Sequence, residues 1–477
     1  MVLFSQKNYI EGAFCDVKLQ DTPLLNPYNG QVLGYMASSK KEDMEKAILA
    51  AQKVHEEGSW YGLSARRAEY LLAIGEGLKP YLEEIAHLES KNTGVVISQT
   101  MGLAKLLPMI FEGAASQVVD HPDKEDLTKK PGVPIELWRK PWGPVLCLTP
   151  WNAPSPIACH KLASAIASGA PVIVKPSEYT PYSIQKVFEV IDKVGLPKGV
   201  VSLIHGGAFE GGLLAGDKRV KAVSFTGGFE GGREVAVSCA KQLKPAQLEL
   251  GGHNPFIILK GADKDKVLDG LIAGLTTLNG QWCRGVGQVF CPQEEKAGLI
   301  EAFVARAARL KIGDPLDAKS EMGPLIHRQH KQRLMQRVLE YGDLGARLTS
   351  PHGFEEHPCF MPPGLIDGLS LKKDIWELFG PLAVVHGYRE EKEVLAAVRA
   401  SDYGLAAYIY GPDTDKIMQL SRQLEVSSVK GGGVTITSLD RDAPRSAWGI
   451  SGLGEEGHFE TYRFFQGASV AGMVEQV

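Results

Sequence analysis

Apolar residues recur along the chain at two different periods, which predict helices and short buried strands in turn. Residues 42–58 carry apolar side chains at helical spacing and end at Gly58. A second helical stretch begins at Ser64, its expected N-cap, and runs to about residue 90. From residue 144 onward, short apolar runs alternate with helical segments, and such runs are typical of buried strands.

This alternation predicts an α/β fold built on a doubly wound parallel sheet. The predicted strands are 144–150, 170–177, 199–206, 220–227, 256–261, 382–388 and 406–411. The predicted helices among them are 155–169, 295–313, and 180–195 with Thr180 as its cap and Pro181 in its first turn. Residues 121–141 are charged and interrupted by prolines, so we expect them to leave the sheet domain.

The composition is ordinary for a globular protein of two or three domains. The chain has 477 residues, of which 44% are hydrophobic and 23% charged, and its formal charge is 52 − 56 = −4. It has no basic excess that would hold nucleic acid or an anionic membrane. No uncharged apolar run approaches the ~20 residues that span a bilayer, and the first residues do not read as a secretory signal. We therefore expect neither nucleic-acid nor membrane partners.

The seven cysteines are scattered through the chain, and no two have the C-x-x-C spacing of a zinc site. Their odd number and wide separation argue against a disulfide framework. We expect a reducing, cytoplasmic setting, free thiols and no bound metal.

One of these cysteines, Cys283 in NGQWCRG (279–285), is a candidate nucleophile. The thiolate is the form that attacks, and an ordinary thiol is mostly protonated at neutral pH. Taken alone, a cysteine in a chain of this size is more often a packing residue, so a catalytic role needs support from other motifs.

A glycine-rich stretch over 224–243 is a candidate nucleotide site. It runs from a predicted strand through Gly227, Gly228, Gly231 and Gly232 into a helix, and the start of a helix offers free N–H groups to anions. The spacing is not G-x-G-x-x-G, so a tight β–α turn is an equal alternative for this stretch alone.

Eight short motifs follow one another along the chain: TPWNAPSP (149–156), KPSEYTP (175–181), FTGGFEGG (225–232), LELGGHNP (248–255), GQWCRG (280–285), MGPLI (322–326), ELFGP (377–381) and SGLGEEG (451–457). In this order and spacing they resemble the aldehyde dehydrogenase superfamily over nearly the whole chain. The resemblance implies a discontinuous NAD-binding domain (1–120 and 142–252) and a second α/β domain, the catalytic domain (253–450). It also implies a small β oligomerisation arm (121–141 and 458–477) in a homodimer or homotetramer.

The same resemblance implies NAD(P)-dependent oxidation of a small aldehyde to a carboxylic acid. Cys283 would form a thiohemiacetal, hydride would pass to nicotinamide, and water would hydrolyse the resulting thioester. Asn152 and the Cys283 backbone N–H are the expected donors to the oxyanion, and one such donor is typically worth ~3–4 kcal/mol of barrier. Glu249 is the expected base that activates water. Because relatives that release the acyl group to coenzyme A need no such base, Glu249 favours hydrolytic release.

Cofactor contacts carry over by motif position. They are Thr149, Trp151, Lys175, Ser177, Glu178, Gly207, Phe225, Thr226, Gly228, Gly251, Glu377 and Phe379. Glu178 would hold the adenosine ribose hydroxyls and repel a 2′-phosphate, so NAD is favoured and NADP remains an alternative. Gly228 stands where relatives commonly have serine or threonine, which removes one hydroxyl contact to the pyrophosphate.

The positions that face the aldehyde in relatives are Trp282, His160, Arg445, Ala153 and Ile157. Arg445 would lie beside an otherwise apolar substrate tunnel, where its guanidinium could bind a carboxylate of the substrate in bidentate fashion. This predicts a semialdehyde or another acidic or strongly polar aldehyde as substrate. The alternative is that Arg445 turns outward and pairs with Asp440 or Asp442.

Three further residues leave alternatives open. Glu456 matches a glutamate sometimes assigned to a proton relay, and a solvated charge is an equal alternative. Arg284 would either lower the pKa of the neighbouring thiol or point away from the site. His253 stands where relatives usually have lysine, and the sequence offers no reason for it.

Two other reaction classes compete with this interpretation. A cysteine hydrolase or acyltransferase without nicotinamide would need a histidine base, and no histidine of this chain lies in a recognisable partner motif. A coenzyme A-acylating aldehyde dehydrogenase would not need Glu249.

Overall fold

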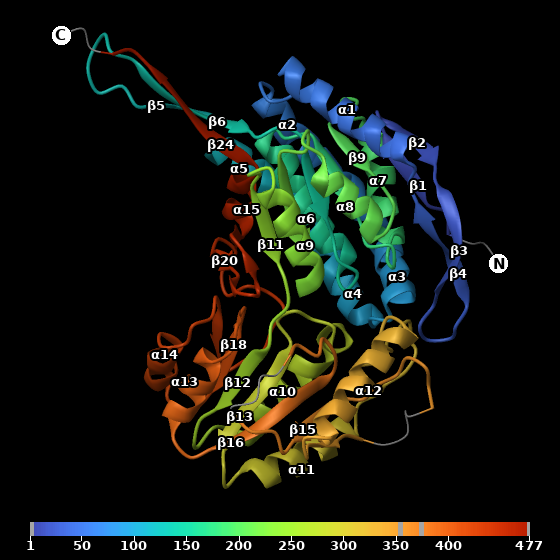
Figure 1. Cartoon of the computed structure of the whole chain (residues 1–477), viewed down its shortest axis with the longest axis vertical. Helices are drawn as coiled ribbons and strands as arrows, with labels where there is room; N and C mark the ends of the chain where they lie inside the picture. Colours follow the sequence, from blue (N-terminus) through green and yellow to red (C-terminus); the bar gives the residue numbers. More distant parts are fainter. Residues whose placement is uncertain (1–3, 352–355, 372–375, 475–477) are drawn as a thin grey trace.

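The computed structural model describes residues 4–351, 356–371 and 376–474, which form two sheet domains and a projecting arm (Figure 1). The predicted α/β fold with parallel sheets is confirmed. The first sheet has the strand order β2-β1-β9-β8-β7-β10-β11-β22. Its strands are β1 (Lys7–Ile10), β2 (Ala13–Asp16), β7 (Val145–Leu148), β8 (Val172–Lys175), β9 (Val201–Leu203), β10 (Ala222–Thr226), β11 (Ala246–Glu249) and β22 (Gly452–Leu453).

The order of this sheet reverses between β7 and β10. The chain builds β7, β8 and β9 outward in one direction and then adds β10 and β11 on the other side of β7, all in parallel. Ligands in sheets of this kind bind beyond the carboxyl ends of the strands at such a reversal. A binding crevice is therefore expected just after Leu148 and Thr226.

The second sheet has the order β14-β15-β16-β13-β12-β18-β19, and only the β14–β15 pair is antiparallel. Its strands are β12 (Asn254–Ile258), β13 (Val286–Pro292), β14 (Arg347–Thr349), β15 (Gly364–Asp367), β16 (Leu382–Tyr388), β18 (Ala407–Tyr410) and β19 (Val429–Gly431). The helices of this part of the chain are α10 (Lys264–Thr276), α11 (Lys296–Ala307), α12 (Arg328–Gly342), α13 (Glu391–Arg399) and α14 (Thr414–Ser421).

The helices of the first domain flank its sheet (Figure 1). They are α1 (Lys41–Glu57), α2 (Ser64–Leu78), α3 (Leu82–Thr93), α4 (Ile97–Ala104), α5 (Leu106–Asp120), α6 (Pro154–Ser168), α7 (Tyr182–Val194), α8 (Ala208–Gly216), α9 (Phe229–Ala240) and α15 (His458–Phe464). A separate hairpin, β3 (Lys18–Leu25) with β4 (Val32–Ser38), lies near the N-terminus.

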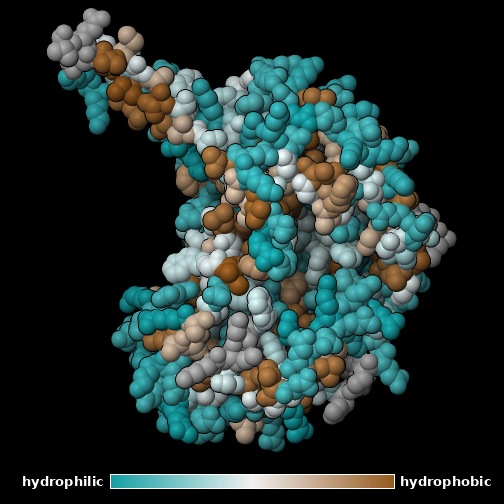
Figure 2. Space-filling model, in the orientation of Figure 1, coloured by the Kyte–Doolittle hydropathy of each residue, from teal (hydrophilic) through white to brown (hydrophobic). Residues whose placement is uncertain are grey.

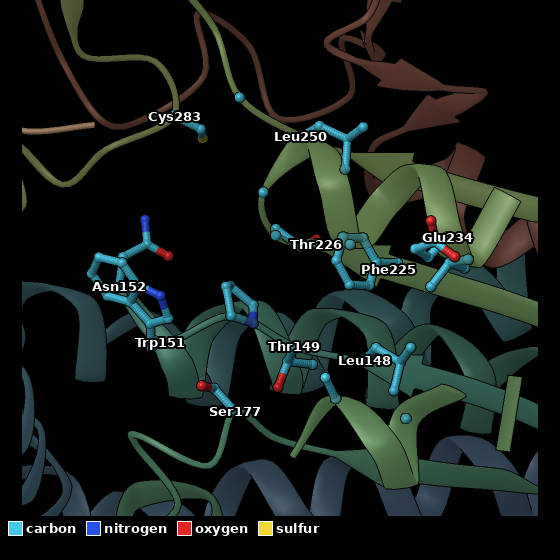
Figure 3. Close-up of a pocket in the computed structure, with 18 of the residues that line it drawn as sticks. Leu148, Thr149, Trp151, Asn152, Ser177, Phe225, Thr226, Glu234, Leu250 and Cys283 are labelled. Atoms are coloured by element: carbon cyan, nitrogen blue, oxygen red, sulfur yellow. The ribbon is translucent and has the colours of Figure 1, made fainter. Parts of the chain in front are cut away.

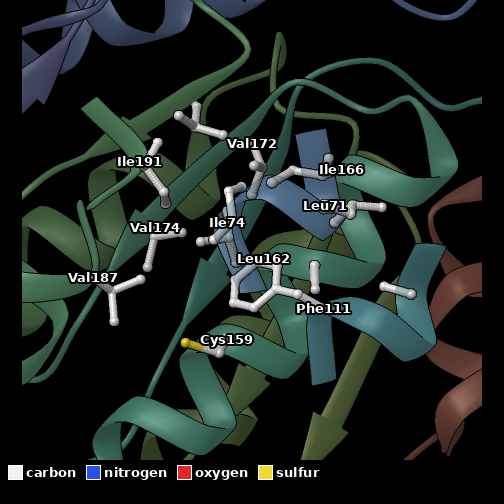
Figure 4. Close-up of a cluster of buried hydrophobic side chains, with 14 of the residues drawn as sticks. Leu71, Ile74, Phe111, Cys159, Leu162, Ile166, Val172, Val174, Val187 and Ile191 are labelled. Atoms are coloured by element: carbon white, nitrogen blue, oxygen red, sulfur yellow. The ribbon is translucent and has the colours of Figure 1, made fainter. Parts of the chain in front are cut away.

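The largest apolar cluster packs α6 against the sheet and against α2, α5 and α7. Figure 4 shows its buried side chains Leu71, Ile74, Phe111, Cys159, Leu162, Ile166, Val172, Val174, Val187 and Ile191. Burial of each large aliphatic or aromatic side chain stabilises a fold by roughly 1.5–3 kcal/mol. Cys159 is one of the packing residues here. Because α6 is held so firmly, the loop that enters it has a fixed position.

Three predicted helix details were wrong. The helix expected from Ser64 to about residue 90 is divided into α2 and α3 by a short 3₁₀ turn over Lys79–Tyr81, because Pro80 cannot continue an α-helix. Leu63, not Ser64, is the N-cap of α2. Thr180 does not cap α7 either, since Pro181 is the N-cap and the Thr180 hydroxyl has no protein partner.

The projecting arm is a three-stranded antiparallel sheet of β5 (Lys124–Asp126), β6 (Ile135–Pro141) and β24 (Gln466–Gly472). The predicted arm boundary at residue 458 needs correction. Helix α15 packs on α5 and α6, and Tyr462 and Phe465 belong to the apolar cluster of the first domain. The arm strand therefore begins only at Gln466, after apolar residues that need a core.

Two features are absent from the described ranges. No helix there is long and apolar enough to cross a membrane. No group of three or more histidine, cysteine, aspartate or glutamate side chains there is arranged to hold a metal ion.

Candidate active site

A cavity of about 910 Å³ opens where the strand order of the first sheet reverses. Its walls come from the ends of β7, β8 and β10, the start of α9, helix α12 and the loop that carries Cys283. Figure 3 shows Asn152 and Trp151 on one side and Cys283 on the other. The cavity thus brings together motifs that lie more than 100 residues apart in sequence.

The loop before Cys283 has an unusual backbone. Leu278, Asn279 and Gly280 all have left-handed φ values of 51°, 58° and 75°. Such a conformation is uncommon for a non-glycine residue and is favoured only where the surroundings impose it. A Cβ at Gly280 would overlap the backbone of Pro381, so glycine is required for this close approach.

The Cys283 thiol is half-buried at the cavity wall. Burial raises its pKa to about 12, and the carboxylates of Glu249 and Glu377 add to this effect, while Arg284 opposes it. The thiol is therefore protonated at neutral pH in the free protein, and it needs a base or a change of surroundings to become a nucleophile.

Asn254 holds the backbone of the nucleophile and has no counterpart among the predicted site residues. Its side-chain amide donates to Cys283 O at 2.9 Å and to Gly285 O at 2.7 Å, and its oxygen accepts from Ala406 N at 3.0 Å. The residue lies in the LELGGHNP motif, but sequence alone gives no signal that its amide reaches 29 residues along the chain.

Asn152 lies between β7 and α6 and is buried. Its amide nitrogen donates one hydrogen bond to Gln281 O at 2.9 Å, and its side chain points across the cavity toward Cys283 (Figure 3). A primary amide has two N–H groups, so one stays available for an oxyanion formed at Cys283.

Glu249 ends β11, and its carboxylate is buried without a hydrogen-bond partner for Oε1 in the described structure. Burial and the negative charge of Glu456 raise the pKa of Glu249 well above its ordinary value of 4.5. Leu250 and Gly251 line the cavity, whereas Glu249 lies just behind that lining. A carboxyl group with a raised pKa is suited to accept a proton near neutral pH.

A charged cluster surrounds Glu456 behind the nucleophile. Lys161 Nζ lies 3.5 Å, Arg445 3.6 Å and His160 4.0 Å from its carboxylate. Burial would raise the pKa of Glu456, but Lys161 and Arg445 outweigh burial and lower it below the ordinary value. Glu456 is therefore a buried ionised group, and the solvated alternative was wrong.

Two predicted substrate residues are placed differently. Arg445 pairs with neither Asp440 nor Asp442, because β20 (Arg445–Ser446) and β23 (Glu455–Glu456) set it directly opposite Glu456. His160 does not line the cavity, since its Nε2 faces Thr461 Oγ1 at 3.2 Å. Burial lowers the pKa of His160 to about 3, so this imidazole is neutral.

The other predicted substrate residues gather beside Cys283. Trp282 and Ala153 are buried in one apolar cluster, and Ile157 and Cys283 pack against that cluster. Of these, only Ile157 and Cys283 also line the cavity. The guanidinium of Arg284 donates a hydrogen bond to Leu405 O at 3.1 Å. Its positive charge opposes the rise in pKa of both Glu249 and the Cys283 thiol.

All predicted cofactor residues except Gly207 line the cavity. Gly207 instead caps α8, where its N–H donates to Glu210 at 2.8 Å. The hydroxyls of Thr149 and Thr226 are buried without a protein partner, and Gly228 leaves the start of α9 uncapped and open. Free N–H groups at a helix start and unpaired hydroxyls fit the phosphates and sugars of a dinucleotide.

Lys175 and Glu377 are fixed at opposite parts of this cavity. Lys175 Nζ donates to Gly206 O at 2.6 Å and Pro176 O at 2.9 Å, which leaves one N–H for a ligand. Glu377 accepts from Gly252 N at 3.0 Å, and burial raises its pKa to about 8. A Cβ at Gly251 would overlap the Glu377 carboxylate, so a larger residue there would displace this carboxylate from its present position.

Helix α12 contributes cavity residues that the sequence did not suggest. His330, Arg333 and Arg337 line the cavity. His330 Nε2 donates to Phe379 O at 2.8 Å, and the Phe379 ring stands edge-on to Trp151 with centroids 5.2 Å apart. The helix follows the MGPLI motif directly, but no periodic or compositional signal marks these three side chains as site residues.

Comparisons with known proteins agree with this geometry. A sequence model of the aldehyde dehydrogenase family matches residues 15–469. Glutarate-semialdehyde dehydrogenase of Pseudomonas putida is 30% identical over 95% of each chain. Betaine aldehyde dehydrogenase of Bacillus subtilis is 31% identical over 95% of this chain and 94% of its own. A crystal structure of betaine aldehyde dehydrogenase from Staphylococcus aureus in complex with NAD+ superposes with a TM-score of 0.93 at 29% identity, over 98% of this chain and 95% of the other.

Proposed function

Because the chain belongs to the aldehyde dehydrogenase family, we propose that it oxidises an aldehyde to the carboxylic acid with NAD, through a thioester on Cys283. The observation that carries the proposal is that Cys283 and Asn152 line the same cavity, while Glu249, directly behind its lining, is close enough for its charge to raise the pKa of the Cys283 thiol. Two further features support binding of a dinucleotide in the rest of that cavity. The buried hydroxyls of Thr149 and Thr226 have no hydrogen-bond partner in the protein, and the start of α9 is uncapped.

Each residue has a separate task in this reaction. The Cys283 sulfur attacks the aldehyde carbon while the thiol proton passes to the former aldehyde oxygen, and Asn152 Nδ2 with the Cys283 backbone N–H stabilises the negative charge that develops on that oxygen; this proton is released when the hydride leaves the carbon. NAD, when bound, supplies the acceptor for the hydride that leaves this carbon. Glu249 takes a proton from the water that attacks the thioester, and the released acid leaves the thiol free again.

The direct test is the absorbance of NADH while the protein is mixed with NAD and a panel of aldehydes. We expect NADH to form without coenzyme A, together with one free acid per NADH, and we expect NADP to serve less well because Glu178 lines the cavity. Dependence on coenzyme A would favour the acylating class instead. Ester cleavage without any NAD reduction would favour a cysteine hydrolase.

The charges behind Cys283 favour an acidic aldehyde. Arg284, Arg445 and Lys161 all lie close enough to Glu456 to lower the pKa of its carboxyl group, so three cations surround this buried ionised carboxylate. Lys430 lies near Arg284 and Arg445, and burial together with the charges of these two residues lowers the pKa of Lys430 to about 8. Excess positive charge attracts a carboxylate such as that of glutarate semialdehyde and repels a quaternary ammonium such as betaine aldehyde.

Arg445→Gln is therefore expected to lower kcat/KM for glutarate semialdehyde about 10- to 100-fold, as for loss of a charge-assisted hydrogen bond of ~1.5–3 kcal/mol. Activity on a neutral aldehyde of similar length should change far less. Arg445→Lys, which keeps the charge, should retain part of the preference, and Arg441→Gln on the exposed neighbouring loop serves as control. Equal losses on both aldehydes in Arg445→Gln would contradict an anion-binding role.

We further propose that the arm joins this chain to a second copy. The arm sheet extends away from both domains (Figure 1), and Figure 2 shows apolar side chains along it. Val470 is 65% exposed and Met473 63%. An uncovered apolar face favours contact with another protein surface, and the edges of a projecting sheet pair readily with other strands.

Val470→Asp should thus shift the protein toward the monomer, because it puts a charge into the proposed contact. Light scattering after size exclusion measures the mass of each form. Leu243→Asp is the matched control, since Leu243 is 92% exposed on the body of the first domain and should leave the mass unchanged. An unchanged mass in Val470→Asp would contradict the proposed interface.

A further inference from the structure

One short segment, Glu89–Gln99, contacts three loops of the site although it does not line the cavity itself. It comprises the end of α3, the turn at Gly94 and the start of α4. Its side chains reach the start of α6, the cofactor motif around Glu178, and the loop before Cys283. These contacts come from three different side chains, each at a different position of the segment.

Glu89 holds the start of α6. It is 2% exposed, and its Oε1 accepts the backbone N–H of Ser155 at 2.7 Å. The N-cap residue of α6, Ala153, offers no side-chain cap, so Glu89 provides the capping acceptor from another helix. Asn152 directly precedes this turn, and the position of its amide depends on where α6 begins.

Asn92 holds the cofactor motif. It is buried, and its Nδ2 donates to the carbonyl of Tyr179 at 2.8 Å. Tyr179 follows Glu178, which lines the cavity and is the proposed partner of the ribose hydroxyls. Loss of this bond frees the backbone immediately beside that carboxylate.

Gln99 holds the loop that carries the nucleophile. Its Oε1 accepts from Leu278 N at 2.7 Å, and its Nε2 donates to Thr276 O at 3.4 Å. Asn279 strengthens the same connection, because its buried Nδ2 donates to Gly94 O at 2.8 Å and to Pro324 O at 2.9 Å. These bonds hold Leu278 and Asn279 in their left-handed conformation.

The segment is itself rigid. Ser90 Oγ, near its start, and Thr100 Oγ1, directly after its end, are 2.7 Å apart and share a hydrogen bond. Thr93 Oγ1 donates to Glu89 O at 2.7 Å and accepts from Val95 N at 3.1 Å. Gly94 has φ 81°, and a Cβ there would come within 2.5 Å of Pro324 O. A rigid segment with three separate contacts sets the distances between the loops that it holds.

We propose that Glu89–Gln99 is a positioning element of the active site. Glu89 positions Asn152, Asn92 positions Glu178, which is the proposed partner of the ribose hydroxyls, and Gln99 positions Cys283. The assignment of roles to those three targets rests on the proposed function. The positioning itself has physical readouts that do not need aldehyde oxidation.

The three side chains predict three different defects. Gln99→Ala should slow alkylation of Cys283 by iodoacetamide about tenfold or more across the pH range, with NAD affinity unchanged. Asn92→Ala should weaken NAD binding, measured by fluorescence titration, by about tenfold, with the alkylation rate unchanged. Glu89→Ala should lower kcat about tenfold or more with little change in KM for aldehyde, because an oxyanion donor acts in the transition state.

Glu89→Gln is the matched rescue, because its amide oxygen still accepts the Ser155 N–H and should restore kcat. Ser98→Ala, at an exposed position of α4, is the control for the segment as a whole and should match the parent protein. The proposal is overturned if the three alanine variants lose activity, NAD affinity and alkylation rate in the same proportion, or if none of them changes any readout. If the parent protein oxidises no aldehyde, the proposed function is wrong. The alkylation rates and NAD affinities of the variants would still test the positioning role.

Discussion

Replacing Cys283 with alanine is expected to abolish NAD-dependent aldehyde oxidation, with a loss of about 10⁴-fold or more in kcat/KM. Among the described residues that line the cavity, Cys283 alone carries a thiol that can form a thioester, so removal of the sulfur removes the reaction path and not only one interaction. NAD affinity should stay close to that of the parent protein, because the cofactor contacts come from other segments. Steady-state assays with an NAD titration measure both quantities.

Cys15→Ala is the control for this experiment. Cys15 and Cys283 are the two half-buried cysteines, while the other five are buried. Cys15 lies in β2 at the edge of the first sheet, and its loss should leave the oxidation rate unchanged. Substantial oxidation by Cys283→Ala would show that the adduct forms elsewhere or that the reaction needs no adduct.

Glu249→Gln is expected to lower turnover by about 10²- to 10⁴-fold, the usual contribution of a general base. The acyl-enzyme should then accumulate, so a first burst of NADH, equal to the number of active sites, should precede a slow steady rate. Rapid mixing with absorbance detection measures the burst. A Gln variant with a normal steady rate would exclude Glu249 as the base that activates water.

The pH dependence gives a second test of Glu249. Burial and the charge of Glu456 raise its pKa above 4.5, so the ionised base becomes available only as pH rises beyond the ordinary carboxyl range. The deacylation rate of the parent protein should increase with pH in that region, and Glu249→Gln should lose this increase. A parent rate that is already constant from pH 5 upward would contradict the raised pKa.

The same shift predicts the effect of Glu249 on stability. Between its ordinary pKa of 4.5 and the higher pKa in the fold, the folded state keeps this proton and the unfolded state releases it. Stability therefore falls as pH rises through this window. Glu249→Gln cannot ionise and should be at least as stable as the parent protein above neutral pH, so its loss of turnover would not reflect unfolding. Thermal denaturation at several pH values measures this.

Much of the architecture was predictable because it depends on short-range patterns. Apolar runs at 144–150 and 382–388 became β7 and β16, since a strand covered on both faces needs only a few consecutive apolar residues. Helix α1 ends where Gly58 adopts a left-handed conformation, as its sequence indicates. The division of the helix after Ser64 could also have been predicted, because Pro80 is visible in the sequence.

The chemistry of the site was only partly predictable. The motifs around Cys283, Asn152 and Glu249 resemble those of a known family, and the residue types suit the reaction that this resemblance implies; the fold places these motifs around one cavity. The contacts of Arg445 and His160 were not predictable. Both depend on Glu456, whose position follows from the pairing of β20 with β23 and from the packing of α15 on α6.

The sequence by itself indicated most of the strands and helices, made Cys283 the candidate nucleophile, and determined which family the chain resembles. Tertiary structure alone decided the contacts between distant side chains, such as Lys161 with Glu456, 295 residues apart, or Gln99 with Leu278, 179 residues apart. The physical reason is one of range. Periodicity and turn preference act over a few residues, whereas hydrogen bonds and charge effects depend on distances that exist only after the core has packed.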